Sequence, residues 1–184
     1  MPLIDASGLK PDGFARPAEG GALPAGDVIL PVARLAADGE EVLSRGDRLG
    51  VELPNTAKLH EIAPFLGRLS LVAIAFPSFA DGRGFSVAKR LRGLGFAGTL
   101  RAAGRLIADQ LRHALGVGFD EVEMPQALIA RQPVSQWLAA LATITQRYQR
   151  NGARGLSILD QRLAARRVLE EGLALEERRV AHAA

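Results

Sequence analysis

Residues 76–86 read Phe-Pro-Ser-Phe-Ala-Asp-Gly-Arg-Gly-Phe-Ser, and they join two segments of different hydrophobic periodicity. The preceding run, residues 69–76, is nearly continuous in apolar residues, which is typical of a strand buried on both faces of a parallel sheet. The following segment, residues 86–94, carries apolar residues at helical spacing with basic residues between them. The stretch therefore predicts a strand, a loop and a helix, with Ser86 as the helix cap.

The same alternation continues along the chain. It predicts strands over 69–76, 99–103 and 120–124, with helices over 86–94 and 106–115 between them. Repeated β-α-β units place the strands parallel, joined by right-handed crossovers. We therefore expect an α/β fold whose parallel β-α-β-α-β unit forms a half-barrel or an open sheet, with flanking helices and a helical C-terminal tail. The predicted strands are too few to close a barrel of about eight strands, so we expect an open sheet or a homodimer that covers its edge.

The chain is predicted to have three parts. They are a flexible leader (residues 1–26), a single α/β domain (27–150) and a helical tail (151–184). The leader is rich in Gly, Pro and Ala, with several turn signals. A length of 184 residues with 48% hydrophobic content suits one principal core.

Three segments outside the regular pattern also carry signals. The run Val28–Leu35 is strand-like, and Pro31 places it at an edge or a bulge. Residues 58–66 have the spacing of a helix, which Pro64 must interrupt or end. Residues 134–150 predict a helix whose apolar face packs on the sheet or on a partner subunit, core packing being favoured.

Composition excludes several classes of protein. The sequence contains no cysteine, which excludes disulfides, iron–sulfur clusters, thiolate metal sites and thiol redox catalysis. The histidines are scattered, so we predict no metal site. We also predict no cofactor. The net charge is only +3 and the basic residues are not clustered, so we expect no nucleic-acid binding. Without a secretion signal or a stretch of roughly 20 apolar residues, we expect a cytoplasmic protein that does not bind membranes.

The predicted topology places a candidate site. In open α/β sheets and in barrels, ligands bind beyond the carboxyl ends of the strands, where the loops of this chain converge. A glycine-flanked arginine and a helix N-terminus suit an anion there, with carboxylates nearby for proton transfer. The predicted ligand-binding residues are Asp81, Gly82, Arg83, Gly84, Ser86, Arg101 and Gln110, and the predicted catalytic residues are Asp109 and Glu123.

Some of these residues have a simpler structural explanation. Asp109 is spaced to stabilise its own helix through basic residues one turn further on. Glu123 suits a buried ion pair with Arg101 of the neighbouring strand. Arg83 is harder to explain in this way, because Gly82 and Gly84 free the backbone on each side of it for unusual dihedrals, which is an unusual setting for an ordinary surface arginine. We therefore favour a ligand or partner role for Arg83.

One apparent cofactor motif is misleading. Gly93–Gly98 matches the dinucleotide-binding pattern G-x-G-x-x-G by letter. It follows a predicted helix and precedes a strand, which is the reverse of the order that aims helix N–H groups at a pyrophosphate. No nicotinamide site is predicted.

Four segments together resemble a known family. They are Phe79–Ser86 (FADGRGFS), Gly98–Gly104 (GTLRAAG), Asp109–Leu111 (DQL) and Gly118–Glu123 (GFDEVE). Their order and spacing resemble the bacterial domain-of-unknown-function family 934 (DUF934), and the resemblance spans residues 27–149. It implies a role in sulfate assimilation, since members of that family typically sit beside sulfite reductase genes and are often labelled as probable oxidoreductases of sulfite reduction.

The residues and this label disagree about redox chemistry, because the chain has no cysteine and no convincing nucleotide fingerprint. Our first hypothesis is therefore a non-redox accessory protein that binds sulfite reductase, its electron donor or a small anion through residues 81–86. The alternative is an enzyme that acts on a small anionic metabolite. A pocket that contains both Asp109 and Glu123 would favour the enzyme, and a flat, partly apolar surface around Phe79 and Phe85 would favour partner binding.

Overall fold

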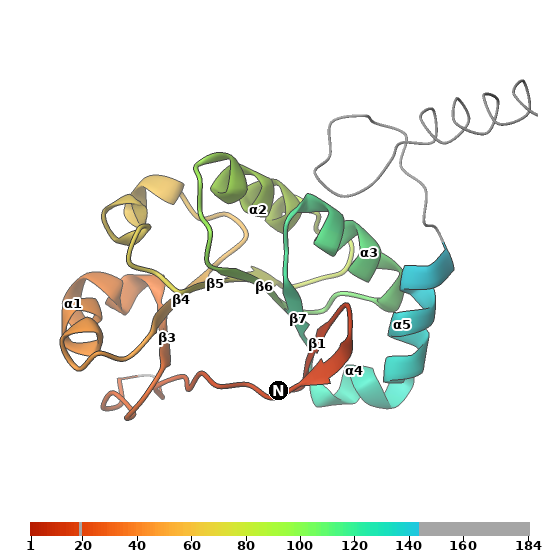
Figure 1. Ribbon diagram of the computed structural model, residues 1–184, viewed down its shortest axis with the longest axis horizontal. Helices are drawn as coiled ribbons and strands as arrows, with labels where there is room; N and C mark the ends of the chain where they lie inside the picture. The colour runs from red at the N-terminus through yellow and green to blue at the C-terminus, as the bar shows by residue number, and fades with distance from the viewer. Residues whose placement is uncertain (19, 144–184) are drawn as a thin grey trace, which may run out of the picture. The chain divides into compact units, whose positions relative to one another are not determined.

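Seven strands form one mixed sheet in the computed structural model, which describes residues 1–18 and 20–143 (Figure 1). Five strands are parallel and follow one another in chain order, and two short amino-terminal strands extend the sheet in antiparallel orientation. The spatial order is β2-β1-β7-β6-β5-β4-β3. The strands are β1 (Leu3–Asp5), β2 (Gly8–Lys10), β3 (Val28–Pro31), β4 (Leu49–Leu53), β5 (Leu71–Phe76), β6 (Thr99–Gly104) and β7 (Glu121–Glu123).

The helices that connect the parallel strands lie along one face of the sheet. Crossovers of one hand between sequential strands place their connections on the same side, as Figure 1 shows for α1, α2 and α3. The predicted α/β fold with a parallel β-α-β-α-β unit is confirmed by β5-α2-β6-α3-β7. The helices are α1 (Val32–Ser44), α2 (Arg83–Gly93), α3 (Ala108–Val117), α4 (Gln126–Arg131) and α5 (Val134–Thr143).

Helix α2 begins at Arg83, so the predicted cap at Ser86 is wrong. Ser86 lies inside the helix with an exposed side chain. The backbone N–H of Arg83 instead donates to Oδ1 of Asp81, at 3.2 Å. Asp81 thereby satisfies one of the free N–H groups of the first turn, which is the task that the sequence pattern assigned to Ser86.

The predicted strand over Val28–Leu35 is wrong beyond Pro31, where β3 ends and α1 follows at once. Proline suits this junction because its fixed φ matches the entry of a helix. The helix buries Leu35, Gly39 and Val42, whose helical spacing is the signal that identifies it. The predicted edge position is confirmed, because β3 is an end strand of the sheet.

The helix predicted over 58–66 is replaced by two 3₁₀ turns, Leu59–Glu61 and Ala63–Phe65. Pro64 lies in the second turn and has no N–H to donate, which prevents a continuous α-helix. This connection between β4 and β5 therefore contains no α-helix.

The segment predicted as a flexible leader, residues 1–26, is partly built into the sheet. β1 pairs with β7, and Leu3 and Ile4 are fully buried. Ala15 forms a parallel bridge with Val28 on the free side of β3. Without this segment β7 and β3 would both expose unpaired backbone groups, so the leader covers both edges of the parallel sheet.

The two faces of the sheet differ in what covers them. We call the face under α1, α2 and α3 the outer face. The opposite face, along which residues 11–18 and 20–27 run, is the inner face (Figure 1). Successive side chains of a strand point to opposite faces. The outer face belongs to the main hydrophobic core, which contains Val51, Val72, Ile74, Leu100 and Val122. The inner face has a small apolar cluster of Ile29, Leu71 and Ala73, against which Phe14 packs.

The predicted helix over 134–150 is described as far as Thr143, as α5. Trp137 is fully buried, and its ring N–H donates to the carbonyl of Gln132 at 3.2 Å. The predicted core packing of this helix is therefore confirmed for its described part. The remainder of that helix and the predicted tail, 151–184, lie outside the described residues. Among the helices of the described part, none is long and apolar enough to cross a membrane.

Candidate functional site

The loop between β5 and α2 presents an exposed ion pair. Nη2 of Arg83 lies 2.6 Å from Oδ2 of Asp81, and the Arg83 side chain is 62% exposed. The hydrogen bond from Arg83 holds the pKa of the Asp81 carboxyl well below its usual range. The charge of Arg83 is therefore balanced within its own loop, by a carboxylate two residues away.

The glycines beside Arg83 have a packing explanation. A Cβ on Gly84 would lie 2.5 Å from Cζ of Phe76, so only glycine lets α2 approach β5 this closely. Gly82 has an ordinary φ of −78° and stands at the helix N-cap. The sequence argument took both glycines as sources of unusual backbone dihedrals, and that interpretation is wrong. The flanking glycines therefore no longer support a ligand-binding role for Arg83.

Phe79 is exposed on a loop whose backbone is held in place. Its side chain is 56% exposed. Gln110, on the first turn of α3, donates from Nε2 to the carbonyl of Phe79 at 2.8 Å. The N–H of Asp81 donates to the carbonyl of Ser78 at 3.1 Å, which closes a turn around Phe79. Gln110, predicted to bind a ligand, thus ties two neighbouring loops together.

Phe85, the second aromatic residue of this region, packs inward. Its ring lies 4.9 Å from that of Phe76 and 4.6 Å from that of His113, measured between centroids. Both distances lie in the usual range for tilted and edge-to-face ring pairs. Phe79, and not Phe85, is therefore the exposed aromatic side chain of this region.

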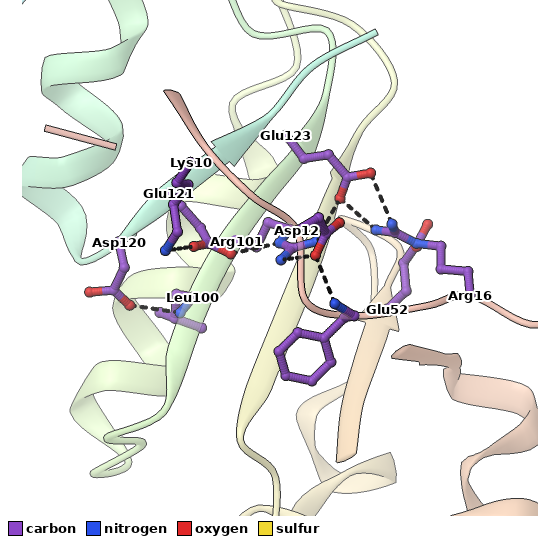
Figure 2. Close-up of polar contacts among 10 residues, drawn as sticks. Lys10, Asp12, Arg16, Glu52, Leu100, Arg101, Asp120, Glu121 and Glu123 are labelled. Atoms are coloured by element: carbon purple, nitrogen blue, oxygen red, sulfur yellow. Dashed lines mark hydrogen bonds and ion pairs between the residues drawn. The ribbon is translucent and has the colours of Figure 1, made fainter. Parts of the chain in front are cut away.

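The inner face holds a buried ionic network centred on Arg101, whose side chain is only 2% exposed (Figure 2). Nε of Arg101 donates to Glu121 at 2.7 Å, and both terminal nitrogens donate to Asp12 at 2.9 Å. Nη1 also lies 3.2 Å from Oε2 of Glu123, which confirms the predicted ion pair between Arg101 and Glu123. Protein carboxylates surround this guanidinium, and its predicted role in ligand binding stays a prediction.

The network extends to the leader and to β4. Arg16 donates to both oxygens of Glu123, at 2.9 and 2.7 Å, and from Nε to Glu52 at 2.7 Å. Lys10 donates to Glu121 at 2.6 Å. Figure 2 shows these side chains converging from the leader and from three strands. The leader thus supplies Lys10, Asp12 and Arg16, which the sequence analysis did not associate with any site.

Hydrogen bonding keeps this network charged. Burial opposes ionisation of Asp12, but hydrogen bonds from Arg101 and from the N–H of Phe14 outweigh it and hold the pKa of Asp12 below its usual value. Burial also opposes the charged form of Arg101, yet its bonds to Asp12 and Glu121 raise the pKa of the guanidinium. Each buried charge is paired with an opposite charge, as a site of low dielectric constant requires.

The two predicted catalytic carboxylates lie on opposite faces of the sheet. Glu123 is fully buried on the inner face, between Arg16 and Arg101. Asp109 is exposed in the first turn of α3, a helix of the outer face. The structure therefore does not bring the two carboxylates together at one site. Among the described residues, no three His, Asp or Glu side chains cluster in a way that could hold a metal ion.

A pocket of about 970 Å³ opens beyond the carboxyl ends of β3, β4 and β5. It lies between the leader and the start of α1, at the carboxyl end of the strands, where the topology predicts ligand sites. The sequence analysis placed its candidate loops further along the sheet, after β5, β6 and β7. The described residues that line the pocket include Arg16, Ile29, Pro31, Val32, Ala33, Arg34, Ala37, Asp38, Glu52, Pro54 and Ala75.

Comparison with protein families identifies one match. The family is described as a bacterial protein of unknown function (DUF934), and its model matches residues 50–158, more than half of the chain. The chain belongs to the DUF934 family. The family inferred from the sequence is thereby confirmed, although the matched segment begins and ends later than the predicted span of residues 27–149. A search of curated proteins gives no match. In this DUF934 protein, Asp12 and Arg16 precede the matched segment, whereas their partners Arg101 and Glu123 lie within it.

Proposed function

We propose that this DUF934 protein is a cytoplasmic, non-redox accessory protein of sulfate or sulfite reduction that binds a partner protein through the Phe79 surface, formed by Phe79, Asp81 and Arg83. The proposed partner is sulfite reductase or the protein that supplies its electrons. The pathway rests on the resemblance to DUF934. The mode of action rests on the structure of the loop between β5 and α2.

The observation that carries this proposal is an exposed aromatic side chain on a fixed backbone. Phe79 is 56% exposed while its carbonyl is held by Gln110. Aromatic residues are enriched at interfaces, and a few such residues contribute most of the binding energy. A preorganised loop loses little conformational freedom on binding. The Asp81–Arg83 pair beside Phe79 offers both signs of charge to a partner.

Two features make partner binding a better fit than catalysis at this loop. Asp109 and Glu123 lie on opposite faces of the sheet, so the pocket containing both carboxylates that would favour the enzyme hypothesis is not found among the described residues. A small anion at Arg83 would have to compete with the Asp81 carboxylate. A protein partner can instead use Phe79 and both charges together.

The test is a titration of the purified protein with purified sulfite reductase and, separately, with its electron-donor protein, followed by calorimetry. We expect one of them to bind, and we expect Phe79→Ala to weaken binding by at least about tenfold. Leu94→Ala is the matched control, because Leu94 is also exposed, at 62%, and follows the far end of α2. No binding to either protein, or an equal loss in both variants, contradicts the proposal.

Thermal-shift measurements with sulfite and sulfate test the small-anion form of the proposal. A protein that binds partners through the Phe79 surface shows no stabilisation that depends on Arg83. An increase in unfolding temperature that is present in the wild type and lost in Arg83→Ala would assign the loop to an anion instead. The predicted homodimer stays a prediction, which light scattering checks.

A further inference from the structure

The pocket beyond β3, β4 and β5 has the properties of a small-molecule site, and it is separate from the Phe79 surface. Its volume of about 970 Å³ lies near the upper end of the range for ligand pockets, roughly 300–1,000 Å³. Carboxyl ends of parallel strands are where α/β proteins bind ligands. This inference is independent of the proposed function.

Most of the pocket lining is apolar and small. Alanines at 33, 37 and 75 leave room that larger side chains would fill. Ile29, Pro31 and Pro54 provide rigid apolar surface, since prolines have a fixed φ. A lining of this kind suits the flat or compact apolar body of an organic molecule.

One side of the pocket carries a cation with donors to spare. Arg34 uses Nε for Asp38 and Nη1 for the carbonyl of Gly21, at 3.0 Å for the latter. Its Nη2 donates to no acceptor among the described residues, and a guanidinium has five N–H donors in total. The Arg34 side chain is 26% exposed, so a bound molecule can reach it.

The position of Arg34 in its helix also favours an anion nearby. Arg34 lies in the first turn of α1, which contains no acidic residue and has no side-chain cap because Pro31 occupies the cap position. The amino-terminal end of a helix carries partial positive charge, so a cation there is unfavourable without a neighbouring anion. Asp38 balances part of this charge from one turn further on.

We propose that this pocket binds a small organic anion, with its apolar body against Ala37 and Ala75 and its carboxylate, phosphate or sulfonate against Arg34. Arg34 is paired with Asp38 through Nε, so the anion is expected at Nη2, which has no acceptor among the described residues. The other cation of the lining, Arg16, already binds Glu52 and Glu123. The ion pair with Arg34 and the apolar contacts with the alanines would then both contribute to the affinity for the ligand.

The experiment uses two fluorescent probes that share one apolar body. They are 8-anilinonaphthalene-1-sulfonate and its uncharged counterpart, N-phenyl-1-naphthylamine, each titrated into the full chain. We expect saturable binding of the sulfonate at one site, weakened about tenfold by Arg34→Ala and abolished by Ala37→Trp, which fills the pocket from an exposed position. Binding of the uncharged probe is expected to respond to Ala37→Trp and not to Arg34→Ala. Arg68→Ala is the matched control, because Arg68 forms an exposed ion pair with Glu40 and is not among the pocket residues.

Several outcomes overturn this inference. They are the absence of saturable sulfonate binding, an undiminished affinity in Ala37→Trp, or equal losses in Arg34→Ala and Arg68→Ala. Each variant is first checked for a wild-type unfolding transition, since partly folded chains bind these dyes nonspecifically. Arg34→Gln replaces Arg34→Ala if the alanine variant does not fold. Competition by benzoate, phenyl phosphate and benzenesulfonate then distinguishes the three anionic groups.

Discussion

The two faces of the sheet bury their residues by different physical means, although the same strands supply both. On β6, Leu100 belongs to the apolar core of the outer face, and the next residue, Arg101, lies in the ionic network of the inner face. On β7, Val122 lies in that core between Glu121 and Glu123, which both bind arginine or lysine. Alternation along a strand thus separates an apolar layer from a charged one.

The difference shows which face stabilises the fold and which one positions the leader. Each large apolar side chain buried on the outer face contributes roughly 1.5–3 kcal/mol. On the inner face, attraction between charges is largely offset by the cost of removing them from water, so a complete network adds little net stability. Removing one member is costly, because its partners stay buried and unpaired. The network therefore favours the leader position in which Asp12 and Arg16 meet their partners.

The largest expected effect comes from removing the central cation. Arg101→Ala leaves Asp12, Glu121 and Glu123 without their shared partner, and we expect the free energy of unfolding to fall by about 3–5 kcal/mol. Urea denaturation measures this loss. Leu100→Ala, one residue away on the outer face, is expected to cost about 2–5 kcal/mol by leaving a cavity. A loss below about 1 kcal/mol in Arg101→Ala would mean that water solvates the inner face and that the comparison of two buried faces fails.

An intermediate effect is expected from overfilling the outer face. Gly84→Ala places a methyl group 2.5 Å from Phe76, and we expect a loss of about 1–3 kcal/mol in the free energy of unfolding. Gly93→Ala in the same helix is the control, because no atom beyond its chain neighbours and its own helix backbone lies within 4 Å of the added Cβ. This control is expected to gain up to about 1 kcal/mol from helix propensity. Equal stability of the two variants would show that α2 does not pack on β5 as closely as described.

The smallest effect concerns the pH dependence of the inner face. Because the pKa of Asp12 is lower in the folded chain than its ordinary value of 3.8, the stability contributed by its charge is present above that value and is lost as the pH falls through the folded pKa. We expect Asp12→Asn to be less stable than the wild type near pH 7, with a difference that shrinks as the pH falls below about 4. Urea denaturation across this range measures it. Asp109→Asn is the control, because it changes an exposed carboxylate on the outer side and is expected to have the stability of the wild type near neutral pH. A stability difference between Asp12→Asn and the wild type that grows toward acid pH would contradict the assigned pairing.

The sequence predicted those features that depend on neighbours along one strand or between adjacent strands. The pairing of Arg101 with Glu123 was one explanation offered for Glu123, because the two residues lie on neighbouring predicted strands, and the structure confirms it. Gly84 was misinterpreted because a glycine is equally consistent with a flexible backbone and with a close contact. Only the position of Phe76 in space distinguishes these explanations.

The pocket and the leader were missed for a related reason. Asp12 lies 89 residues before Arg101, and Arg16 lies 107 residues before Glu123. No local pattern connects residues so far apart, and a Gly- and Pro-rich segment resembles a loose end until its partners are known. Helix α1, by contrast, has a local signal in Leu35, Gly39 and Val42 that could have identified it.

The sequence by itself determined the strands and helices of the central unit and their parallel order, because hydrophobic periodicity and glycine positions act over a few residues. The tertiary structure alone decided which face received helices and which received the leader, and where a pocket was left open. The reason is that ion pairing and close packing depend on distances in space, which segments far apart in the chain acquire only by folding.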